Sequence, residues 1–364
     1  MGKHKQPLSV LIFGAGLVGG ESLDILQAAG ISVIGYLDNF KPTDELFKGK
    51  PVYRPGSAPA KIDRGTPVVN SVRRPDVSPE IIEKELLALG WGNVLTLGAF
   101  IRRHYAQYGD IFWRTEPGFY AQPERRTAID TVRALWADTK SREIYDALLA
   151  FRLAFDCQQL PAPDKDMYFP FDIPGFWQAP VRFVDGGAYN GDTLDALLKK
   201  GIPVETAAEF EPSLDNFHHL TRRCAEFGQQ YTDSSFLCWP CALGDKEENV
   251  SFRIRSDCPV GNYLADDGEI QVPIVSLDHV LTGFRPTVIK LDIEGAELKA
   301  LAGAREVLKA YRPNWSVCLY HHVDDLWEIP LWFMRNTSSQ DYKYYLRSYA
   351  WGGFDEYCLY AMHA

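Results

Sequence analysis

An acidic residue followed by a glycine-rich turn is the part of this sequence best suited to binding a small molecule. Asp185 ends a short apolar strand pattern and leads into Gly186-Gly187-Ala188-Tyr189-Asn190-Gly191-Asp192-Thr193. Leucines at helical spacing follow, so the segment predicts a strand, a tight turn and the start of a helix. Glycine lets backbone N–H groups come close to a ligand, and a helix N-terminus carries partial positive charge. The turn therefore predicts a cradle for a ligand with a carboxylate or a phosphate.

A second acid has the position expected of a ribose ligand. Glu211 follows the apolar segment Ala207-Ala208-Glu209-Phe210 and lies 26 positions after Asp185. In open α/β sheets, ligands bind outside the carboxyl ends of the strands, and an acid about 20 residues after the glycines binds the ribose hydroxyls. We therefore predict that Glu211 ends the next strand and binds the ribose of a nucleoside.

A similar unit occurs near the N-terminus. The strand pattern Ser9–Phe13 is followed by Gly14, Gly16 and Gly19 in a GxGxxG arrangement, and Asp38 comes 19 positions after the last of these glycines. Strand, glycine turn, helix, strand and acid form the fingerprint of a dinucleotide site. The pattern predicts a bound dinucleotide or nucleotide sugar. It is equally compatible with a scaffold whose glycines only let a helix pack closely on a strand.

Five motifs, in order, resemble one family of enzymes. Val288–Asp292 repeats the pattern of an apolar strand that ends in an acid, and Glu294 and Glu297 follow it. With four other segments, this stretch resembles the FkbM-type S-adenosylmethionine-dependent methyltransferases, from about Tyr168 to the C-terminus. The segments are Val-Asp-Gly-Gly-Ala-x-x-Gly-Asp-Thr (184–193), Phe-Glu-Pro (210–212), Ala-Leu-Gly-Asp (242–245), Ser-Leu-Asp (276–278) and Lys-Leu-Asp-Ile-Glu-Gly-Ala-Glu (290–297).

The resemblance implies how the methyl donor S-adenosylmethionine would bind. The glycine turn and the helix start would line its methionine end, Glu211 would bind its ribose, and a later segment would form the adenine wall. The residues implied, besides Glu211, are Asp185, Gly187, Tyr189, Gly191, Asp192, Thr193, Ala242 and Asp245. Asp185 is alternatively a helix cap, and Gly244-Asp245-Lys246 alternatively a plain turn. Many methyltransferases have glycine in place of Tyr189, so this side chain is expected to point away from the donor or to pack over it.

By the same resemblance, Asp292, Glu294 and His321 are expected where the methyl group meets its acceptor. Either carboxylate is a candidate to hold acceptor hydroxyls, while Glu294 and Glu297 are alternatively ordinary acids in the first turn of a helix. Methyl transfer to a hydroxyl also needs a proton acceptor, and a near-neutral imidazole suits that role. His321 is the candidate base, and the alternative is a structural histidine at the end of a strand.

The same segments contain residue types that bind divalent metal ions. Asp292, Glu294, His321 and Asp324 offer oxygen and nitrogen ligands. Their spacing along the chain does not establish a site, so the sequence favours a methyltransferase that works without a metal.

An alternating α/β fold is needed to bring these residues together. Asn249–Val275 predicts an inserted hairpin, and Tyr342–Tyr349 with Glu356–Met362 predicts a C-terminal antiparallel hairpin. The expected fold class is α/β, and the resemblance implies a doubly wound, mostly parallel sheet of the class I methyltransferase type. Its core strands are predicted at Arg182–Asp185, Thr206–Glu211, Ser235–Cys238, Thr287–Asp292 and Trp315–Tyr320.

Three parts are expected along the chain. Residues 1–122 are predicted to form a smaller Rossmann-like nucleotide-binding domain, residues 123–165 a helical connector, and residues 166–364 the methyltransferase domain. The connector contains two helical stretches with little glycine or proline, and Pro161-Ala162-Pro163 marks its end.

Composition and charge limit the class of protein. With 46% hydrophobic residues, the 364-residue chain is able to form two packed cores, and it has no stretch typical of a membrane helix. Its seven cysteines are irregularly spaced, so we expect a reducing compartment, the cytoplasm, and structural roles for Cys238 and Cys241. The net charge is +2 over the first 165 residues and −12 over the remainder. An acidic catalytic half disfavours nucleic acid as a substrate.

The sequence therefore predicts an S-adenosylmethionine-dependent O-methyltransferase that acts on a hydroxyl of a sugar or a secondary metabolite, with neither nucleic acid nor membrane as a partner. Two alternatives are a non-catalytic protein that binds a nucleotide or nucleotide sugar, and an NAD(P)-linked oxidoreductase that uses the N-terminal domain. Whether copies of the chain form a homo-oligomer is left open.

Overall fold

Two large sheets, one in each of two units, organise the chain. The structure, a computed structural model, describes residues 8–43, 45–72, 74, 77–108, 119–154, 160–255, 261–338, 340–351 and 355–364. Its contacts divide the chain into two units. Unit 1 comprises Met1–Pro123, Glu143–Lys165 and Tyr349–Phe354, and unit 2 comprises Glu124–Arg142, Asp166–Ser348 and Asp355–Ala364.

Unit 1 contains a six-stranded sheet with the order β3-β4-β2-β1-β5-β6. Alternate residues of β1 (Ser9–Phe13) face opposite sides of the sheet and enter two different core clusters. Helices α1 (Leu17–Ala28) and α3 (Leu97–Tyr108) contribute to one cluster and α2 (Pro79–Ala88) to the other, so both faces are covered. The remaining elements are β2 (Ser32–Leu37), β3 (Leu46–Phe47), β4 (Lys50–Tyr53), η1 (Pro55–Ser57), β5 (Val68–Asn70) and β6 (Val94–Thr96).

Unit 2 contains a seven-stranded sheet with the order β16-β17-β15-β14-β7-β8-β9. Six of the seven strands run in the same direction, and β17 runs antiparallel between β15 and β16. The chain proceeds from β7 outward to β9 and then to β14 and β15 on the other side, so the order reverses between β7 and β14. The predicted doubly wound sheet with a C-terminal antiparallel hairpin is confirmed. The strands are β7 (Val181–Gly186), β8 (Val204–Phe210), β9 (Ser235–Trp239), β14 (Val288–Leu291), β15 (Asn314–Cys318), β16 (Tyr342–Ser348) and β17 (Tyr357–His363).

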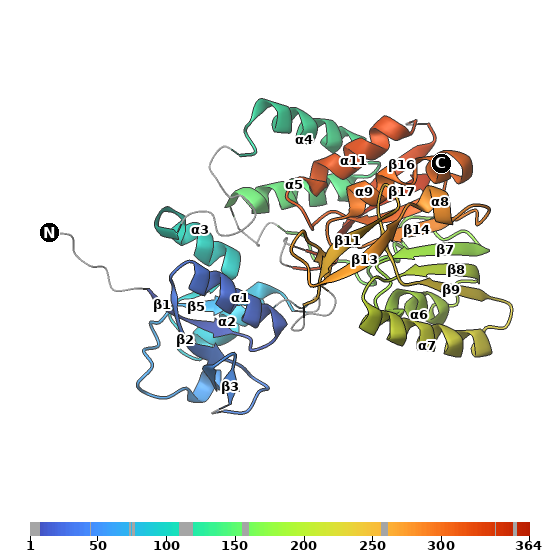
Figure 1. Cartoon of the computed structure of the whole chain (residues 1–364). Coiled ribbons are helices and arrows are strands. Elements are labelled where there is room, and N and C mark those ends of the chain that lie inside the picture. The colour runs from blue at the N-terminus through green and yellow to red at the C-terminus, as the bar shows by residue number, and fades with distance from the viewer. Residues whose placement is uncertain are drawn as a thin grey trace. The chain divides into compact units, whose positions relative to one another are not determined.

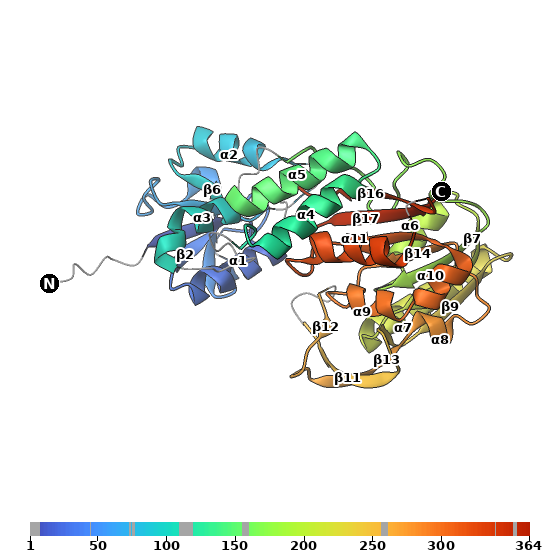
Figure 2. The ribbon, with the colours of Figure 1, turned by 90° about the horizontal axis from the view of Figure 1, so that it is seen from above.

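Helices cover both faces of the unit 2 sheet. Figure 1 shows α6 (Asp192–Lys199) and α7 (Leu214–Gln230) on one face, with α9 (Glu297–Ala302) and α11 (Asp325–Asn336) on the other. Phe333 of α11 makes ring contacts with Trp315 and Tyr344, which places this helix against the antiparallel end of the sheet (Figure 2). The predicted connector forms α4 (Pro123–Leu135) and α5 (Thr139–Ala154). Of all the helices described, none has the length and apolar character needed to cross a bilayer.

The segment after β14 forms two short helices, α9 and α10 (Arg305–Tyr311), although the spacing of Leu298, Leu301, Val307 and Leu308 is typical of one helix. A side chain at Gly303 would lie 2.1 Å from the backbone oxygen of Gly244, so a close approach of two loops separates the helices. The second helix begins at its own cap, because the Asp278 carboxylate accepts the N–H groups of Glu306 and Val307 at 3.2 and 2.8 Å. The apolar spacing of the sequence does not reveal this break.

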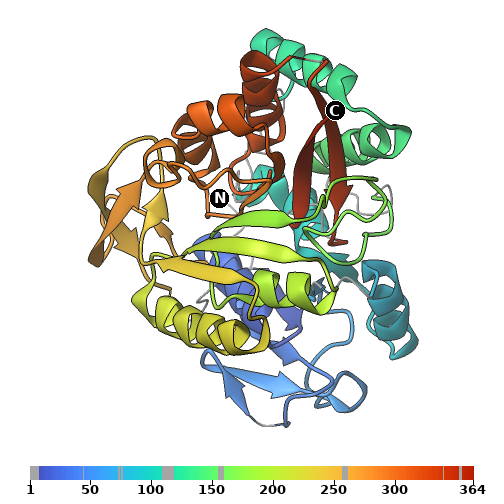
Figure 3. The same ribbon diagram turned by 90° about the vertical axis from the view of Figure 1, so that its right-hand side faces the viewer.

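The inserted hairpin is confirmed and is part of a four-stranded sheet with the order β10-β13-β11-β12. β11 (Glu248–Arg253) and β13 (Ile270–Val275) are antiparallel, and their buried residues pack with Ala242 of β10 (Ala242–Leu243). β12 (Tyr263–Leu264) pairs with β11, and α8 (Leu277–Val280) follows the insertion. Figure 3 shows these strands apart from the main sheet of unit 2, and they supply part of the cavity wall described below.

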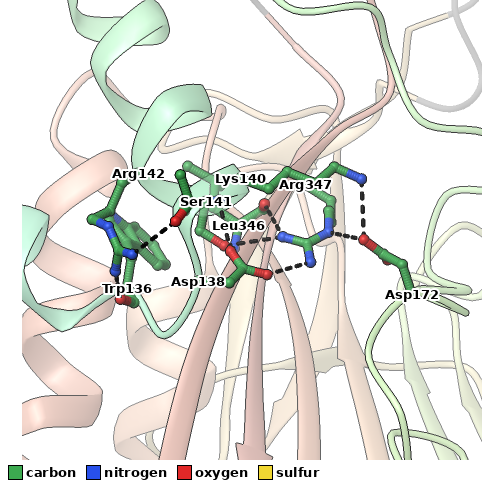
Figure 4. A network of polar contacts seen from close by, with 9 residues as sticks. Trp136, Asp138, Lys140, Ser141, Arg142, Asp172, Leu346 and Arg347 are labelled. Atoms are coloured by element: carbon green, nitrogen blue, oxygen red, sulfur yellow. Dashed lines mark hydrogen bonds and ion pairs between the residues drawn. The ribbon is translucent and has the colours of Figure 1, made fainter.

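A buried arginine joins three segments of unit 2 (Figure 4). Arg347 of β16 is 1% exposed and donates to Asp138 at 2.7 Å, to Asp172 at 2.8 Å and to Ser141 at 2.9 Å. Asp138 lies in the turn between α4 and α5, Ser141 lies in the first turn of α5, and Asp172 lies in the segment before β7. These contacts fix the segment before β7, which also carries Tyr168, to the C-terminal hairpin.

Candidate active site

A cavity of about 220 Å³ lies where the order of the unit 2 strands reverses. Ligands of doubly wound sheets bind at this place, outside the carboxyl ends of the strands. The glycine turn, the end of β8, the segment after β9, the inserted sheet and the segment after β14 all contribute to the wall. The lining residues are Tyr168, Gly187, Tyr189, Asp192, Thr193, Phe210, Glu211, Pro212, Asn216, Cys241, Ala242, Leu243, Phe252, Asn262, Leu264, Lys290, Asp292, Ile293, Glu294, Ala296 and Tyr320.

The turn after β7 needs glycine at position 187. Gly187 has φ +77°, and a side chain there would lie 1.9 Å from the backbone oxygen of Asp292. Only glycine therefore lets this turn pass the segment after β14 so closely. Tyr189 has φ +48° and lines the cavity, whereas Gly191, at φ +80°, is outside the wall and precedes α6. Four of the predicted donor ligands from this turn line the cavity: Gly187, Tyr189, Asp192 and Thr193.

Glu211 lies at the cavity with its carboxylate held by backbone groups. One oxygen accepts the N–H of Tyr189 at 2.9 Å, and the other accepts the N–H of Ser213 at 2.9 Å and the Asn216 amide at 3.4 Å. Burial raises the pKa of Glu211 to about 7, although these hydrogen bonds lower it. A carboxylate has about four acceptor positions, so Glu211 keeps acceptor capacity for a ligand hydroxyl. It is placed between the glycine turn and α7, at the predicted end of β8.

Asp185 lies behind the cavity wall and not in it. It is fully buried, and Lys290 Nζ lies 2.8 Å from its carboxylate because β7 and β14 pair in register at these two residues. The same ammonium group donates to the backbone oxygen of Gly187 at 2.7 Å. Burial raises the pKa of Asp185 to about 7, against the opposing effect of Lys290. Asp185 is not among the lining residues, and it positions the glycine turn through Lys290, which the sequence analysis did not select.

Two tyrosines hold Asp292 at the cavity. The hydroxyls of Tyr168 and Tyr320 donate to its carboxylate at 2.5 and 3.1 Å. Burial raises the pKa of Asp292, but Lys290, His321 and the Tyr168 hydrogen bond outweigh burial, and the net shift is downward. Asp292 is therefore ionised at neutral pH. Sequence reasoning missed both tyrosines, because Tyr168 lies outside the predicted strands and Tyr320, which ends one of them, is not an acid.

His321 lies among three carboxylates. Its Nδ1 is 2.8 Å from Glu297, and its Nε2 is 3.4 Å from Asp292 and 3.7 Å from Glu294. Burial lowers the pKa of His321, but the carboxylates, Glu297 first, raise it to about 10. The sequence analysis expected a near-neutral imidazole at His321. This prediction is wrong, because the neighbouring carboxylates favour the protonated ring.

The two glutamates near His321 are not ordinary helix acids. Glu297 is 1% exposed and also accepts the N–H of Ile293 at 2.8 Å. Glu294 precedes α9, has φ +54° and lines the cavity, and burial raises its pKa to about 7. Both carboxylates thus face inward, toward His321.

Two other candidate residues lie away from the cavity wall. Asp245 is exposed beyond Gly244, while its neighbour Ala242 lines the cavity as expected. Asp324 is exposed at the start of α11. The inserted sheet instead brings Phe252, Asn262 and Leu264 to the wall, for which the sequence contains no signal beyond an alternating pattern.

The N-terminal glycine turn makes its contacts within unit 1. Gly14 has φ +101°, and a side chain at Gly19 would lie 1.9 Å from the Gly14 oxygen, so both glycines serve the turn itself. Asp38 accepts the N–H of Ala15 at 2.8 Å, which joins the end of β2 to the turn. A side chain at Gly16 would meet nothing within 4 Å. These contacts give Gly14, Gly19 and Asp38 structural roles that need no ligand.

The charge of the unit 2 cavity suits a cationic ligand such as a sulfonium. Among its described lining residues, carboxylates are contributed by Asp192, Glu211, Asp292 and Glu294, and the ammonium of Lys290 is committed to Asp185. Since burial strengthens electrostatic interactions, this excess of acids favours a positive ligand.

Comparison with known proteins relates the segment that forms most of this cavity to one family. Residues 185–344 match the model of the methyltransferase FkbM domain. The crystal structure of a methyltransferase FkbM from Methylobacillus flagellatus KT is similar, with a TM-score of 0.74 and 21% identity, over 98% of this chain and 90% of that chain. An rRNA methylase from Streptococcus thermophilus matches with a TM-score of only 0.31 and 10% identity, over 50% of this chain and 84% of its own. No curated protein matches significantly in sequence. Residues 185–344 are therefore similar to the methyltransferase FkbM domain, and the glycine turn, Glu211 and Asp292 lie within this match.

Proposed function

We propose that this protein is an S-adenosylmethionine-dependent methyltransferase that methylates a hydroxyl group of a sugar or a secondary metabolite. The observation that carries the proposal is Glu211, a buried carboxylate at the cavity wall that backbone N–H groups hold next to the glycine turn. This is where a nucleoside's ribose binds in a doubly wound sheet.

The lining residues suit the parts of the donor. Backbone groups of Gly187 and Tyr189, together with Asp192, would hold its methionine end, and Glu211 would accept the ribose hydroxyls. Ala242 and Leu243 offer an apolar wall for the adenine. When bound, S-adenosylmethionine supplies an electrophilic methyl group on a positively charged sulfur, which the cavity's acidic character favours.

The acceptor would lie beside Asp292, Glu294 and the hydroxyls of Tyr168 and Tyr320. In the transfer, the acceptor oxygen would form a bond to the methyl carbon as the carbon–sulfur bond breaks, and the electron pair would stay on sulfur. The hydroxyl proton would pass to the carboxylate of Glu294, which lines the cavity and whose pKa burial raises to about 7. The protein contributes mainly by holding the reacting atoms in line and by excluding water. Carboxylates and phenolic hydroxyls accept and donate hydrogen bonds, so this part of the wall suits a polyhydroxylated acceptor.

Donor binding is tested with S-adenosylhomocysteine, the demethylated product. Calorimetry and thermal unfolding of the wild type are compared with Glu211→Ala and with Glu205→Ala, a matched change at an exposed position of the same strand. We expect binding in the wild type and Glu205→Ala, and its loss in Glu211→Ala. Equal binding by all three proteins would remove the main support for the proposal.

Methyl transfer is tested with S-adenosylmethionine labelled in its methyl group and a panel of hydroxylated sugars and metabolites. Label transferred to oxygen, in a product with one methyl in place of one hydrogen, supports an O-methyltransferase. In parallel, NAD(H), NADP(H) and UDP-sugars are tested by thermal unfolding. Stabilisation by NAD(H) that is lost only in Asp38→Ala would favour the oxidoreductase alternative, because Asp38 belongs to the N-terminal glycine unit.

A further inference from the structure

We propose that Asp292, Glu294 and His321 bind one divalent cation at the acceptor side of the cavity. One ligand atom from each residue lies within 4.8 Å of the others. His321 Nε2 is 3.4 Å from Asp292 Oδ1 and 3.7 Å from Glu294 Oε2. Neighbouring donors around an ion at about 2.1 Å are about 3 to 3.4 Å apart. Small side-chain movements would therefore complete the coordination.

His321 supplies the independent observation. Its side chain is 8% exposed, and Nε2 is buried without a hydrogen-bond partner although it faces two carboxylates. The other ring nitrogen, Nδ1, is 2.8 Å from Glu297, which is itself fixed by the N–H of Ile293. A carboxylate that orients a histidine in this way is typical of metal-ligating histidines, because it fixes the ring with the second nitrogen toward the ion.

The charges around the ring favour a doubly positive ion. Asp292, Glu294 and Glu297 surround a single imidazole. The buried ammonium group of Lys290 already pairs with Asp185 and donates to the Gly187 oxygen. Buried carboxylates are stable when they are paired or coordinate a metal, so a divalent cation would compensate this excess.

The carboxylate and imidazole ligands indicate which ions would bind and which kind of methyl acceptor would suit the site. Two carboxylates and one imidazole suit Mn²⁺ or Mg²⁺, which prefer oxygen and keep further coordination positions open. Asp292 and Glu294 line the cavity, so those positions would face it and would accept oxygens of the acceptor. The acceptor would then carry two neighbouring oxygens. This role rests on the proposed function, whereas binding of the ion does not.

The proposal goes beyond the sequence, which favours a metal-independent enzyme. Of the four potential ligands, the structure brings Asp292, Glu294 and His321 together and leaves Asp324 exposed at the start of α11. Asp324→Asn is therefore a matched control, because it removes the same charge three positions from His321 without altering the cluster.

The test uses Mn²⁺ as the probe and the full-length protein. Electron paramagnetic resonance of a Mn²⁺ titration should show one bound ion per chain, and pulsed measurements should show coupling to a directly coordinated nitrogen. Loss of an orienting carboxylate typically weakens metal binding about 10–100-fold, so Glu297→Gln should fall in that range. Asp292→Asn and His321→Ala should weaken binding more than about 100-fold, since these residues are ligands themselves. Asp324→Asn should bind like the wild type.

Several outcomes would overturn the proposal. These are a wild type that binds no stoichiometric Mn²⁺, a bound ion without nitrogen coupling, or binding that persists in His321→Ala and Asp292→Asn. Thermal unfolding shows whether each variant is folded, and calorimetry with S-adenosylhomocysteine separates the two proposals. If Mn²⁺ binds as described while S-adenosylhomocysteine does not bind the wild type, the proposed function fails and the metal site stands.

Discussion

Lys290 is the residue that connects the acid at the end of β7 to the glycine turn. Its ammonium lies 2.8 Å from Asp185 and donates to the Gly187 oxygen at 2.7 Å, and it is 3% exposed. Burial lowers the pKa of Lys290, but Asp185 and Asp292 outweigh this effect and raise it, so the side chain stays charged. One buried cation thus holds both the strand-end acid and the turn that lines the cavity.

Removal of this cation should destabilise the fold. Lys290→Met leaves Asp185 buried without its partner, and breaking a buried ion pair in this way costs about 3–5 kcal/mol. Urea denaturation should show this loss of unfolding free energy. The double variant Lys290→Met/Asp185→Asn should recover much of it, because the buried charge is then gone. An unchanged stability in the single variant would contradict the assigned pairing.

Glu211 should make donor binding depend on pH. Its pKa is about 7, and a ribose hydroxyl that donates to the carboxylate favours the ionised form. Affinity for S-adenosylhomocysteine should therefore increase as the pH rises through about 7 and then level off. Calorimetry of the wild type and Glu211→Gln checks this, since the amide variant should bind more weakly and lack this pH dependence. A flat wild-type profile would argue against the contact.

The same pKa shift has the opposite effect on the stability of the unliganded protein, which should fall as the pH rises. Glu211 ionises near 4.5 when unfolded and near 7 when folded, so its ionisation opposes folding. Its contribution should lower the unfolding free energy as the pH rises from about 4.5 to about 7, with no further change above. The difference between the wild type and Glu211→Gln in denaturant unfolding isolates this contribution.

At the scale of elements, the site depends on how closely the segments after β7 and β14 approach. Gly187 lies in the first segment and Asp292 in the second. The backbone oxygen of Asp292 occupies the place that a side chain at Gly187 would need. The strands pair in register, Asp185 opposite Lys290, so both segments leave the sheet at the same edge. This arrangement brings the predicted donor and acceptor residues to one cavity.

A matched pair of glycine variants tests this approach. Gly187 and Gly283 have similar backbone angles, φ +77° and +79°, but a side chain at Gly283 would meet nothing within 4 Å. Gly283→Ala should lower stability by about 1–2 kcal/mol, the cost of a left-handed backbone. Gly187→Ala should cost more and should weaken S-adenosylhomocysteine binding, because the Asp292 carbonyl must move. Similar losses in both variants would show that the close approach is unimportant.

Arg347 stabilises unit 2 through partners from distant segments. Arg347→Met should lower the unfolding free energy by about 1.5–3 kcal/mol, the range for hydrogen bonds to charged groups, because Asp138 and Asp172 lose a buried donor. Lys140→Met is the control: its ammonium pairs with the same Asp172 at 3.0 Å but is 41% exposed. This exposed pair should contribute less than about 1 kcal/mol. Equal effects in urea denaturation would contradict the role given to burial.

At the scale of the whole molecule, the described cavity wall belongs entirely to unit 2, from Tyr168 to Tyr320. The glycine turn of unit 1 is stabilised by its own contacts, with Asp38 bonded to Ala15. The two glycine motifs therefore differ in their surroundings. The turn of unit 2 lines a cavity that also contains Glu211, whereas in unit 1 Asp38 accepts a hydrogen bond from the turn itself.

Hydrogen exchange should show this difference directly. S-adenosylhomocysteine should slow amide exchange in residues 187–193 and 211–216, since a ligand that binds the native state suppresses opening of the segments it contacts. Residues 14–19 should exchange as before. Mass spectrometry of the protein with and without the ligand checks this, and protection confined to residues 14–19 would place the donor in unit 1 instead.

Much of the fold was predictable because it depends on local patterns. Apolar segments ending in Asp185, Glu211 and Asp292 defined three parallel strands, and the structure has a strand at each. The alternating pattern of the insertion likewise predicted β11 and β13. The break at Gly303 was not predictable, because it comes from a loop more than fifty positions away at Gly244.

The sequence by itself determined the order of strands and helices, the glycine turn and the position of Glu211 at a strand end, since these follow from periodicity and backbone preference over short distances. Only the tertiary structure decided what each acid contacts. It paired Asp185 with Lys290, surrounded His321 with three carboxylates, and placed Tyr168 against Asp292, 124 positions away. The protonation states and the proposed metal site depend on those distances, because burial and neighbouring charge act through space and not along the chain.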